Sequence, residues 1–453
     1  MVISLYSEYK QDGVIMAGSF SKKMKNIMTF GYLMKLDKKI PQDLDKIKKK
    51  QDRNVHRLMK SAYDIPFYRE KFESVGLTPD DFHSAEDLAK FPTTNRAEVR
   101  TWMEKIIAED PEAYDKWEIF TTSGSSGDPL KFFQTARETA CLNANWIRIL
   151  MFAGYKPFTG KMYSFKTSHR SLDEKKGDSW VQKLGILRRK VVPEDNCVGE
   201  GIRDIINDIN EYKPDLLSFR RNCLVRMALF AQRNDLEIHR PDIFVPVSEM
   251  VDDMTRTILK ETFGDGLMDA YGSSETGSCI VQVPGADRYY ICNDTHVVNL
   301  YDDDGQLADE GKVVITTLLK RDFPFINYDI GDRATSVTEK GVRFITSIQG
   351  RVNDFVKHES GIDSSAYFLR KIPNGITGIA QFRYIQESYH DIHVQLVRDL
   401  KNNDHTQEEI EKYFLERVDS KYGDEFNITF EWLDVIPPDE NGKMRCFVCK
   451  VDQ

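Results

Sequence analysis

Residues 271–277 read YGSSETG and bring an aromatic ring, two glycines, three aliphatic hydroxyls and one carboxylate into seven consecutive positions. A flat base could stack on Tyr271, a phosphate could bind near Ser274, and a metal ion could bind Glu275, because rings, hydroxyls and carboxylates suit these ligands. Gly272 would let the backbone approach such a ligand closely. A turn around a buried tyrosine uses the same residue types, so this segment alone leaves both interpretations open.

A second segment rich in hydroxyls and glycines lies upstream, at residues 121–129 (TTSGSSGDP). The N–H and O–H groups of such a loop can surround phosphate oxygens. The spacing is not that of a P-loop, and a flexible linker has a similar composition. Apolar flanks, with Phe120 before the segment and Leu142 and Trp146 after it, weigh against a linker. The candidate phosphate-binding residues are Ser123, Gly124, Ser125, Ser126 and Gly127.

Three further segments lie downstream, at residues 328–332 (YDIGD), 350–357 (GRVNDFVK) and 441–445 (NGKMR). Asp332 follows a glycine at a predicted strand end, where its carboxylate could accept hydrogen bonds from both hydroxyls of a ribose. Taken singly, these segments are also typical of a surface turn, a solvated linker and a turn with an exposed lysine.

Hydrophobic periodicity predicts a mixed α/β (α+β) chain. Residues 202–209 place four isoleucines on one helical face, and residues 406–418 begin with a capping box and continue with an apolar face. Residues 392–396 and 426–432 alternate as strands do. The C-terminal part therefore reads as a small α/β unit, and a domain boundary is expected near Gly350.

The five segments, in this order, together resemble the signature motifs of the adenylate-forming enzymes: acyl-CoA synthetases, aryl-acid and amino-acid adenylation domains, and luciferase. Residues 123–129 resemble the phosphate loop, 271–275 the Y-G-x-T-E segment and 328–332 the Y-x-x-G-D segment. Residues 350–357 resemble the hinge motif, and Gly442-Lys443 resembles the loop of the catalytic lysine.

A closer resemblance is to the phenylacetate–CoA ligase branch, including relatives found beside capsule genes. Residues 65–72 (IPFYREKF) look like its "P-F-Y-R-x-x-F" segment, and residues 88–100 continue it. The resemblance covers the chain from Val55 onward. Five features depart from the family pattern. Ser274 replaces a usual Thr, Asn327 stands where Arg often precedes the Tyr, and Lys131 comes one residue later than in many relatives. Val247-Ser248-Glu249 replaces a more Gly-rich segment beside the adenine, and Asn353 stands at the hinge where Asp or Lys is common.

The resemblance implies a large N-terminal adenylate-forming domain, residues 1–350, and a small mobile C-terminal α/β domain, residues 351–453. It implies an acid–thiol ligase that uses ATP and Mg²⁺ to activate an aryl or small organic acid as the acyl-adenylate, then transfers the acyl group to CoA. It implies catalytic roles for Lys443, Glu275 and Ser274, with Mg²⁺ on Glu275. The residues implied to bind the nucleotide are Ser123, Gly124, Ser125, Ser126, Gly127, Ser248, Glu249, Tyr271, Gly272, Ser273, Asp332 and Arg351.

Two alternatives stay open. The acyl group could pass to an acyl carrier protein thiol or an amine instead of CoA. The chain could also be a nucleotide-binding partner module that has lost catalysis. The joint presence of Glu275, Asp332, Arg351 and Lys443 argues against the second alternative, because a lapsed enzyme has no need of the whole set.

Composition limits the partners. The 453 residues carry 63 Lys and Arg against 72 Asp and Glu, a net charge of −9, which gives no support for a nucleic-acid binder. Seven scattered cysteines argue against a disulfide scaffold, and neither a membrane span nor a secretory signal is visible, so we expect a cytoplasmic protein. The lysine run at residues 46–50 is either a solvated helix face or a docking patch for an acidic partner or a membrane surface.

Overall fold

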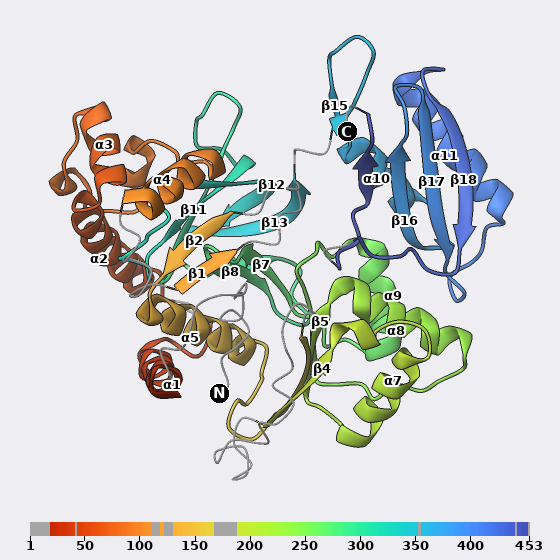
Figure 1. The fold of residues 1–453 in the computed structure, drawn as a ribbon, viewed down its shortest axis with the longest axis horizontal. Helices are drawn as coiled ribbons and strands as arrows, with labels where there is room; N and C mark the ends of the chain where they lie inside the picture. Colours follow the sequence, from red (N-terminus) through yellow and green to blue (C-terminus); the bar gives the residue numbers. More distant parts are fainter. Residues whose placement is uncertain are drawn as a thin grey trace. The chain divides into compact units, whose positions relative to one another are not determined.

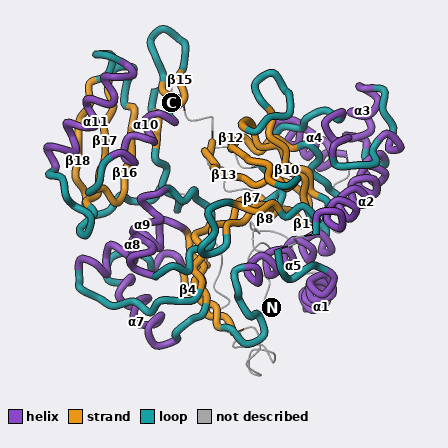
Figure 2. Tube along the Cα trace, turned by 180° about the vertical axis from the view of Figure 1, so that it is seen from behind, coloured by secondary structure: helices purple, strands orange, loops and turns teal. Residues whose placement is uncertain are grey.

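The structure is a computed structural model, and it describes residues 19–40, 43–109, 118–121, 130–166, 188–351, 355–439 and 442–451. The chain forms two compact units. Unit 1 comprises Met1–Gly160, Arg170–Arg189 and Ala270–Ile348; unit 2 comprises Lys161–His169, Lys190–Asp269 and Gln349–Gln453. Each unit combines helices with β-sheets (Figures 1 and 2), which confirms the predicted mixed α/β class.

Unit 1 is organised around a seven-stranded sheet with the order β10-β11-β12-β13-β9-β8-β7. The strands are β7 (Asp269–Ser273), β8 (Gly277–Gln282), β9 (Tyr289–Ile291), β10 (His296–Tyr301), β11 (Glu310–Thr317), β12 (Tyr328–Glu339) and β13 (Val342–Arg351). Alternate residues of these strands, among them Ile280, Leu300 and Ile315, point into one buried apolar cluster. The sheet is the frame that carries the residues 271–277 and 328–332.

The helices of unit 1 come mainly from the first third of the chain. They are α1 (Ser19–Lys35), α2 (Leu44–Tyr63), α3 (Pro66–Val75), α4 (Arg96–Glu109) and α5 (Ala136–Phe152), with short 3-10 turns at Pro79–Asp81 and Glu86–Lys90. Tyr68 and Phe72 of α3 are buried with Phe91 in a core of edge-on aromatic rings. The strands β1 (Glu118–Thr121) and β2 (Lys131–Gln134) pair antiparallel on either side of residues 122–129.

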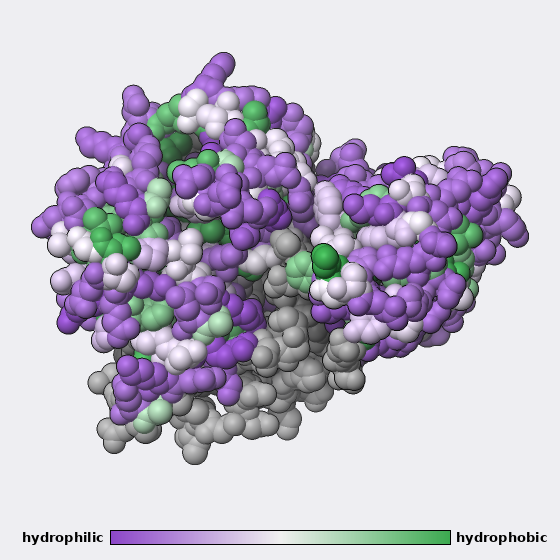
Figure 3. Space-filling view, turned by 90° about the horizontal axis from the view of Figure 1, so that it is seen from above, coloured by the Kyte–Doolittle hydropathy of each residue, from purple (hydrophilic) through white to green (hydrophobic). Residues whose placement is uncertain are grey.

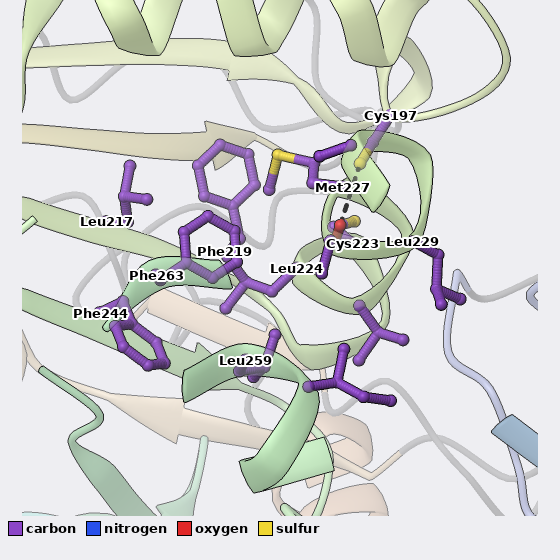
Figure 4. Packing of buried hydrophobic residues seen from close by; sticks show 14 of the residues in the cluster. Cys197, Leu217, Phe219, Cys223, Leu224, Met227, Leu229, Phe244, Leu259 and Phe263 are labelled. Carbon is purple, nitrogen blue, oxygen red and sulfur yellow. Dashed lines mark hydrogen bonds between the residues drawn. The ribbon is translucent and has the colours of Figure 1, made fainter. Parts of the chain in front are cut away.

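Unit 2 contains a four-stranded sheet with the order β4-β3-β5-β6, in which β3, β5 and β6 run parallel. Its strands are β3 (Lys161–Lys166), β4 (Arg188–Pro193), β5 (Leu216–Arg220) and β6 (Ile243–Val247), and its helices are α7 (Gly201–Tyr212), α8 (Arg221–Arg233) and α9 (Asp253–Phe263), with a 3-10 turn at Glu194–Asn196. Figure 4 shows Phe219 and Phe244 packing with Leu224, Leu259 and Phe263. Every residue of β5 is buried, as expected for a parallel strand covered on both faces.

The C-terminal part of unit 2 holds a second sheet, with the order β18-β17-β16-β19. Its elements are β14 (Phe355–Val356), β15 (Ser364–Ser365), α10 (Tyr367–Lys371), a 3-10 turn (Ile372–Gly375), β16 (Ile379–Gln386), β17 (Asp391–Arg398), α11 (Gln407–Tyr422), β18 (Asn427–Leu433) and β19 (Phe447–Cys449). Helix α11 packs on this sheet through Ile410, Phe414 and Val418.

The periodic segments predicted from the sequence are confirmed. The four isoleucines of residues 202–209 are all buried on α7, and the capping box forms at Thr406 with Glu409. Both alternating segments are strands, β17 and β18. On the face of the molecule drawn in Figure 3, hydrophobic residues occur in small groups among hydrophilic ones. No helix in the described residues is long and apolar enough to cross a membrane.

Candidate active site

The YGSSETG segment forms a β-hairpin in unit 1, with β7 and β8 joined by a turn at residues 274–276. Ser273 and Thr276 close the turn: the Thr276 amide donates to the Ser273 hydroxyl at 3.2 Å, and the Ser273 amide donates to the Thr276 hydroxyl at 3.3 Å. Gly272 is required for packing, because a Cβ there would overlap the backbone of Gly277. The hairpin therefore holds Ser273 and Ser274 at the turn between β7 and β8, at one edge of the seven-stranded sheet.

Tyr271 and Asp332 come together across the sheet. The Tyr271 hydroxyl donates to Oδ2 of Asp332 at 2.6 Å. Burial raises the pKa of Tyr271 well above its usual value, and the adjacent Asp332 charge raises it further, so the phenol stays protonated and remains a donor. Two residues that the sequence placed in separate candidate segments are thus joined by a direct hydrogen bond.

Asp332 lies inside β12, whereas the sequence suggested a strand end. The register between β11 and β12 shifts here: Lys312 faces Arg333 but Val314 faces Asp329. The extra residues form a β-bulge in which Gly331 adopts a φ of +86°. A bulge redirects the side chains beside it. The glycine that was interpreted as a turn signal instead allows a bulge within a continuous strand.

Glu275 is buried, with 3% of its surface exposed. The Tyr328 hydroxyl donates to its Oε1 at 3.2 Å, which links the hairpin to the first residue of β12. Lys320 also contacts this turn, because its Nζ donates to the Glu275 carbonyl at 3.3 Å. Burial among aromatic rings lowers the pKa of Lys320 to about 8, opposed by Glu138 and Glu275.

A buried polar network holds the hairpin through the carbonyls of Thr276 and Ser278, and no sequence pattern predicted it. Arg148 of α5 is fully buried and pairs with Asp294 at 2.6 Å. Its second nitrogen donates to Asn145, whose amide donates to the Ser278 carbonyl at 2.8 Å. His296 bonds the Thr276 carbonyl through Nε2 at 2.9 Å. Because a carbonyl only accepts, Nε2 carries the proton; burial lowers the pKa of His296 to about 4, so the ring is neutral.

In unit 2, the predicted residues Ser248 and Glu249 directly follow β6. Ser248 has a φ of +71°, so it keeps the left-handed backbone that favours glycine, the residue type it replaces. The Glu249 carboxylate binds groups of the protein itself. Its Oε2 accepts from the backbone amide of Asn222 at 3.0 Å, and Arg221 lies 3.5 Å from its Oε1. These groups cluster where the parallel strands β5 and β6 end, a common ligand-binding edge in α/β folds.

The loop of Lys443 lies at this same edge. Oε1 of Glu249 accepts from the backbone amide of Met444 at 2.8 Å. Gly442 has a φ of +76°, and a Cβ there would lie 2.6 Å from Nη1 of Arg220. Arg220 also pairs with Glu194 at 3.0 Å; burial, assisted by the charge of Glu249, raises the pKa of Glu194 to about 7 against the pull of Arg220. The loop of Lys443 is therefore held at this edge by a contact of its backbone with Glu249.

Part of the predicted site lies outside the described residues. This holds for Ser123, Gly124, Ser125, Ser126 and Gly127, for the side chain of Arg351 and for the hinge residue Asn353. No group of three or more His, Cys, Asp or Glu side chains suited to a metal ion occurs in the described part of the chain. Glu275 is the carboxylate predicted to hold Mg²⁺, an ion that proteins commonly bind through one or two carboxylates and the phosphates of a nucleotide.

The chain is similar to known proteins over most of its length. Residues 357–450 match the family model described as the CapK C-terminal domain. The chain is 26% identical to phenylacetate-coenzyme A ligase of Aromatoleum evansii over 353 residues, which cover 70% of this chain and 74% of the relative. It is 23% identical to Protein CapK of Staphylococcus aureus over 381 residues, 79% of each chain.

The fold is that of adenylate-forming ligases. A 2-hydroxyisobutyryl-CoA ligase, solved in complex with 2-HIB-AMP, superposes with a TM-score of 0.69 at 16% identity, over 92% of this chain and 95% of that one. These similarities in sequence and in fold support an adenylate-forming, phenylacetate–CoA ligase-like family for this chain.

Proposed function

We propose that this protein activates an aryl or small organic acid with ATP as the acyl-adenylate and transfers the acyl group to CoA. The observation that carries the proposal is Glu275, a buried carboxylate held by Tyr328 in the turn of a hairpin that also presents Tyr271 to Asp332. A single fixed carboxylate beside hydroxyls suits an ion that arrives with phosphates. Bound Mg²⁺ would offset the charge of the phosphates when the acid anion approaches.

Each predicted residue has a task in this proposal. Tyr271, Gly272, Ser248 and Glu249 flank the adenine, and Asp332 with Arg351 fixes the ribose and so the angle of attack. The loop of Ser123, Gly124, Ser125, Ser126 and Gly127, with Ser273 and Ser274, holds the phosphates. Lys443 neutralises charge in the transition state. Residues 351–453 act as a small mobile domain that rotates about Asn353 between the two steps.

The Glu275→Gln substitution should raise the Mg²⁺ concentration that acyl-adenylate formation requires. Gln keeps the size of Glu and can still accept from Tyr328, but it lacks the negative charge. We expect the Mg²⁺ concentration for half-maximal ATP–pyrophosphate exchange to rise at least about tenfold, roughly 1.4 kcal/mol. Glu310→Gln, an exposed position of the same sheet, is the matched control. Unchanged exchange at low Mg²⁺ would remove Glu275 from the metal site.

Removing the ring of Tyr271 should weaken ATP binding. A stack comparable to an aromatic pair contributes about 0.5–1.5 kcal/mol, so Tyr271→Ala should raise the ATP dissociation constant about 2- to 13-fold. Tyr271→Phe keeps the ring and loses only the hydrogen bond to Asp332, so it separates stacking from positioning. Titration calorimetry gives both constants. An Ala variant that binds ATP as the wild type does would mean that the ring serves only the core.

The acid and the acceptor are tested in sequence. Exchange with a panel of aryl and small aliphatic acids identifies the acid class, and the best acid is then offered with CoA or with acyl carrier protein. The proposal expects thioester formation on CoA. Acylation of the carrier protein alone would reassign the second step while keeping the first.

A further inference from the structure

The outer face of α1 is an exposed apolar stripe. Met24, Ile27, Phe30 and Met34 are spaced three to four residues apart, which places them on one side of the helix, and they are between 42% and 66% exposed. The ring of Phe30 meets the exposed ring of Phe158 at 5.9 Å. Single exposed apolar side chains are ordinary. In the described residues, however, five of the fourteen exposed large apolar side chains gather at this one place.

The opposite face of α1 is fixed to the protein. Leu33 packs with Ala144 and Ile147 of α5, and Tyr32 and Leu36 flank this contact. Figures 1 and 2 both show α1 alongside α5. The stripe is thus presented on a preformed helix held along the surface of unit 1, and burying it would cost little conformational entropy.

The sequence of α1 and of the residues that follow it is rich in lysine. From Lys22 to Lys50 the sequence holds ten lysines and three aspartates, in a chain whose net charge is −9. Lys35, Lys39 and Lys49 are exposed. Lys38 contacts the stripe itself, with Nζ 3.8 Å from the sulfur of Met34. This segment, which the proposed function does not use, concentrates positive charge against the sign of the whole molecule.

We propose that the α1 stripe, defined as Met24, Ile27, Phe30, Met34 and Phe158, docks this protein reversibly on an anionic lipid surface. A helix with an apolar face and flanking lysines lies in the membrane interface, where the apolar side chains enter the acyl boundary and the ammonium groups meet lipid phosphates. A second copy of the chain is a poorer occupant, because a symmetric contact would bring two lysine clusters together.

The test is co-sedimentation of the full chain with vesicles. We expect binding to vesicles containing about one third phosphatidylglycerol, little binding to pure phosphatidylcholine, and loss of binding at about 0.5 M salt, where charges are screened within a few ångströms. Ile27→Ser/Phe30→Ser should weaken binding at least tenfold, and Lys35→Gln/Lys39→Gln/Lys49→Gln should weaken it as well. Val75→Ser/Leu307→Ser removes exposed apolar side chains elsewhere on unit 1 and should bind as the wild type does.

The outcomes are decisive because every substituted side chain is exposed, and an unchanged thermal midpoint verifies the fold of each variant. Wild-type protein that sediments no better with anionic than with neutral vesicles would overturn the proposal. So would a stripe variant that binds as tightly as the wild type. Self-association that depends on Ile27 and Phe30, without vesicle binding, would also overturn it and identify a second copy as the occupant.

Discussion

The Lys443→Ala substitution should lower the rate of acyl-adenylate formation by about 100- to 1000-fold. By analogy with the loss of an oxyanion donor, this corresponds to an increase of about 2.7–4 kcal/mol in the activation free energy. A cation that acts mainly in the transition state affects the rate more than binding, so the dissociation constants for ATP and acid should change little. The contacts that seat the loop use backbone atoms, since the Met444 amide bonds Glu249 and the Lys443 carbonyl accepts from the Asp439 amide at 2.6 Å. The substitution therefore leaves these anchors in place.

The second step separates catalysis from structure. Lys443→Ala is supplied with chemically made acyl-adenylate and CoA, and thioester formation should persist while adenylation collapses. Lys450→Ala, which removes a lysine that pairs with Glu387 in the same C-terminal sheet region, is the matched control for both steps. If the Lys443 variant lost both steps equally, the lysine would be structural or the small domain would not rotate, and the two-state mechanism would be withdrawn.

The Arg148→Met substitution should destabilise unit 1 more than any substitution of an exposed residue. Arg148 and Asp294 form a pair with both side chains almost completely buried, and removing one partner of such a pair typically costs about 3–5 kcal/mol. For a unit of this size that corresponds to a drop in thermal midpoint on the order of 10 °C. Exchange activity should fall as well, because the same network holds the carbonyls of Thr276 and Ser278.

Two comparisons isolate the unpaired charge. Lys50 also contacts Asp294, at 3.0 Å, but it is partly exposed, so Lys50→Met should cost much less than Arg148→Met. Arg148→Met/Asp294→Leu removes both charges and should recover part of the lost stability, because a buried apolar pair leaves no unpaired charge in the core. A double variant as unstable as Arg148→Met would show that packing, and not the abandoned charge, sets the cost.

Sequence reasoning succeeded where a pattern is local. The buried face of α7 and the capping box of α11 follow from residue spacing alone, because a helix brings positions three and four apart onto one side. The segments that contain Tyr271 and Lys443 stand out as motifs for the same reason, while the roles proposed for these two residues stay predictions. Each motif is a short run whose residues remain neighbours after folding.

It failed where partners are distant in the chain. Arg148 and Asp294 are 146 residues apart, and neither lies in a recognisable motif. The contacts of the Glu249 carboxylate with the backbone amides of Asn222 and Met444 could not be predicted, because no periodicity connects these residues. The bulge at Gly331 depends on the register of β11 against β12, and a strand's own sequence does not encode its partner's register.

Acyl-adenylate formation is tested most directly by identifying what the protein makes from ATP and an acid in the absence of any thiol. The wild-type protein is incubated with Mg²⁺, ATP and members of the acid panel, quenched, and its products are separated by mass spectrometry. We expect pyrophosphate and an acyl-AMP in amounts stoichiometric with the protein, formed only with the accepted acid and consumed to AMP and acyl-CoA when CoA is added. Formation of ADP and phosphate, or no acid-dependent product across aryl and small aliphatic acids, would contradict it.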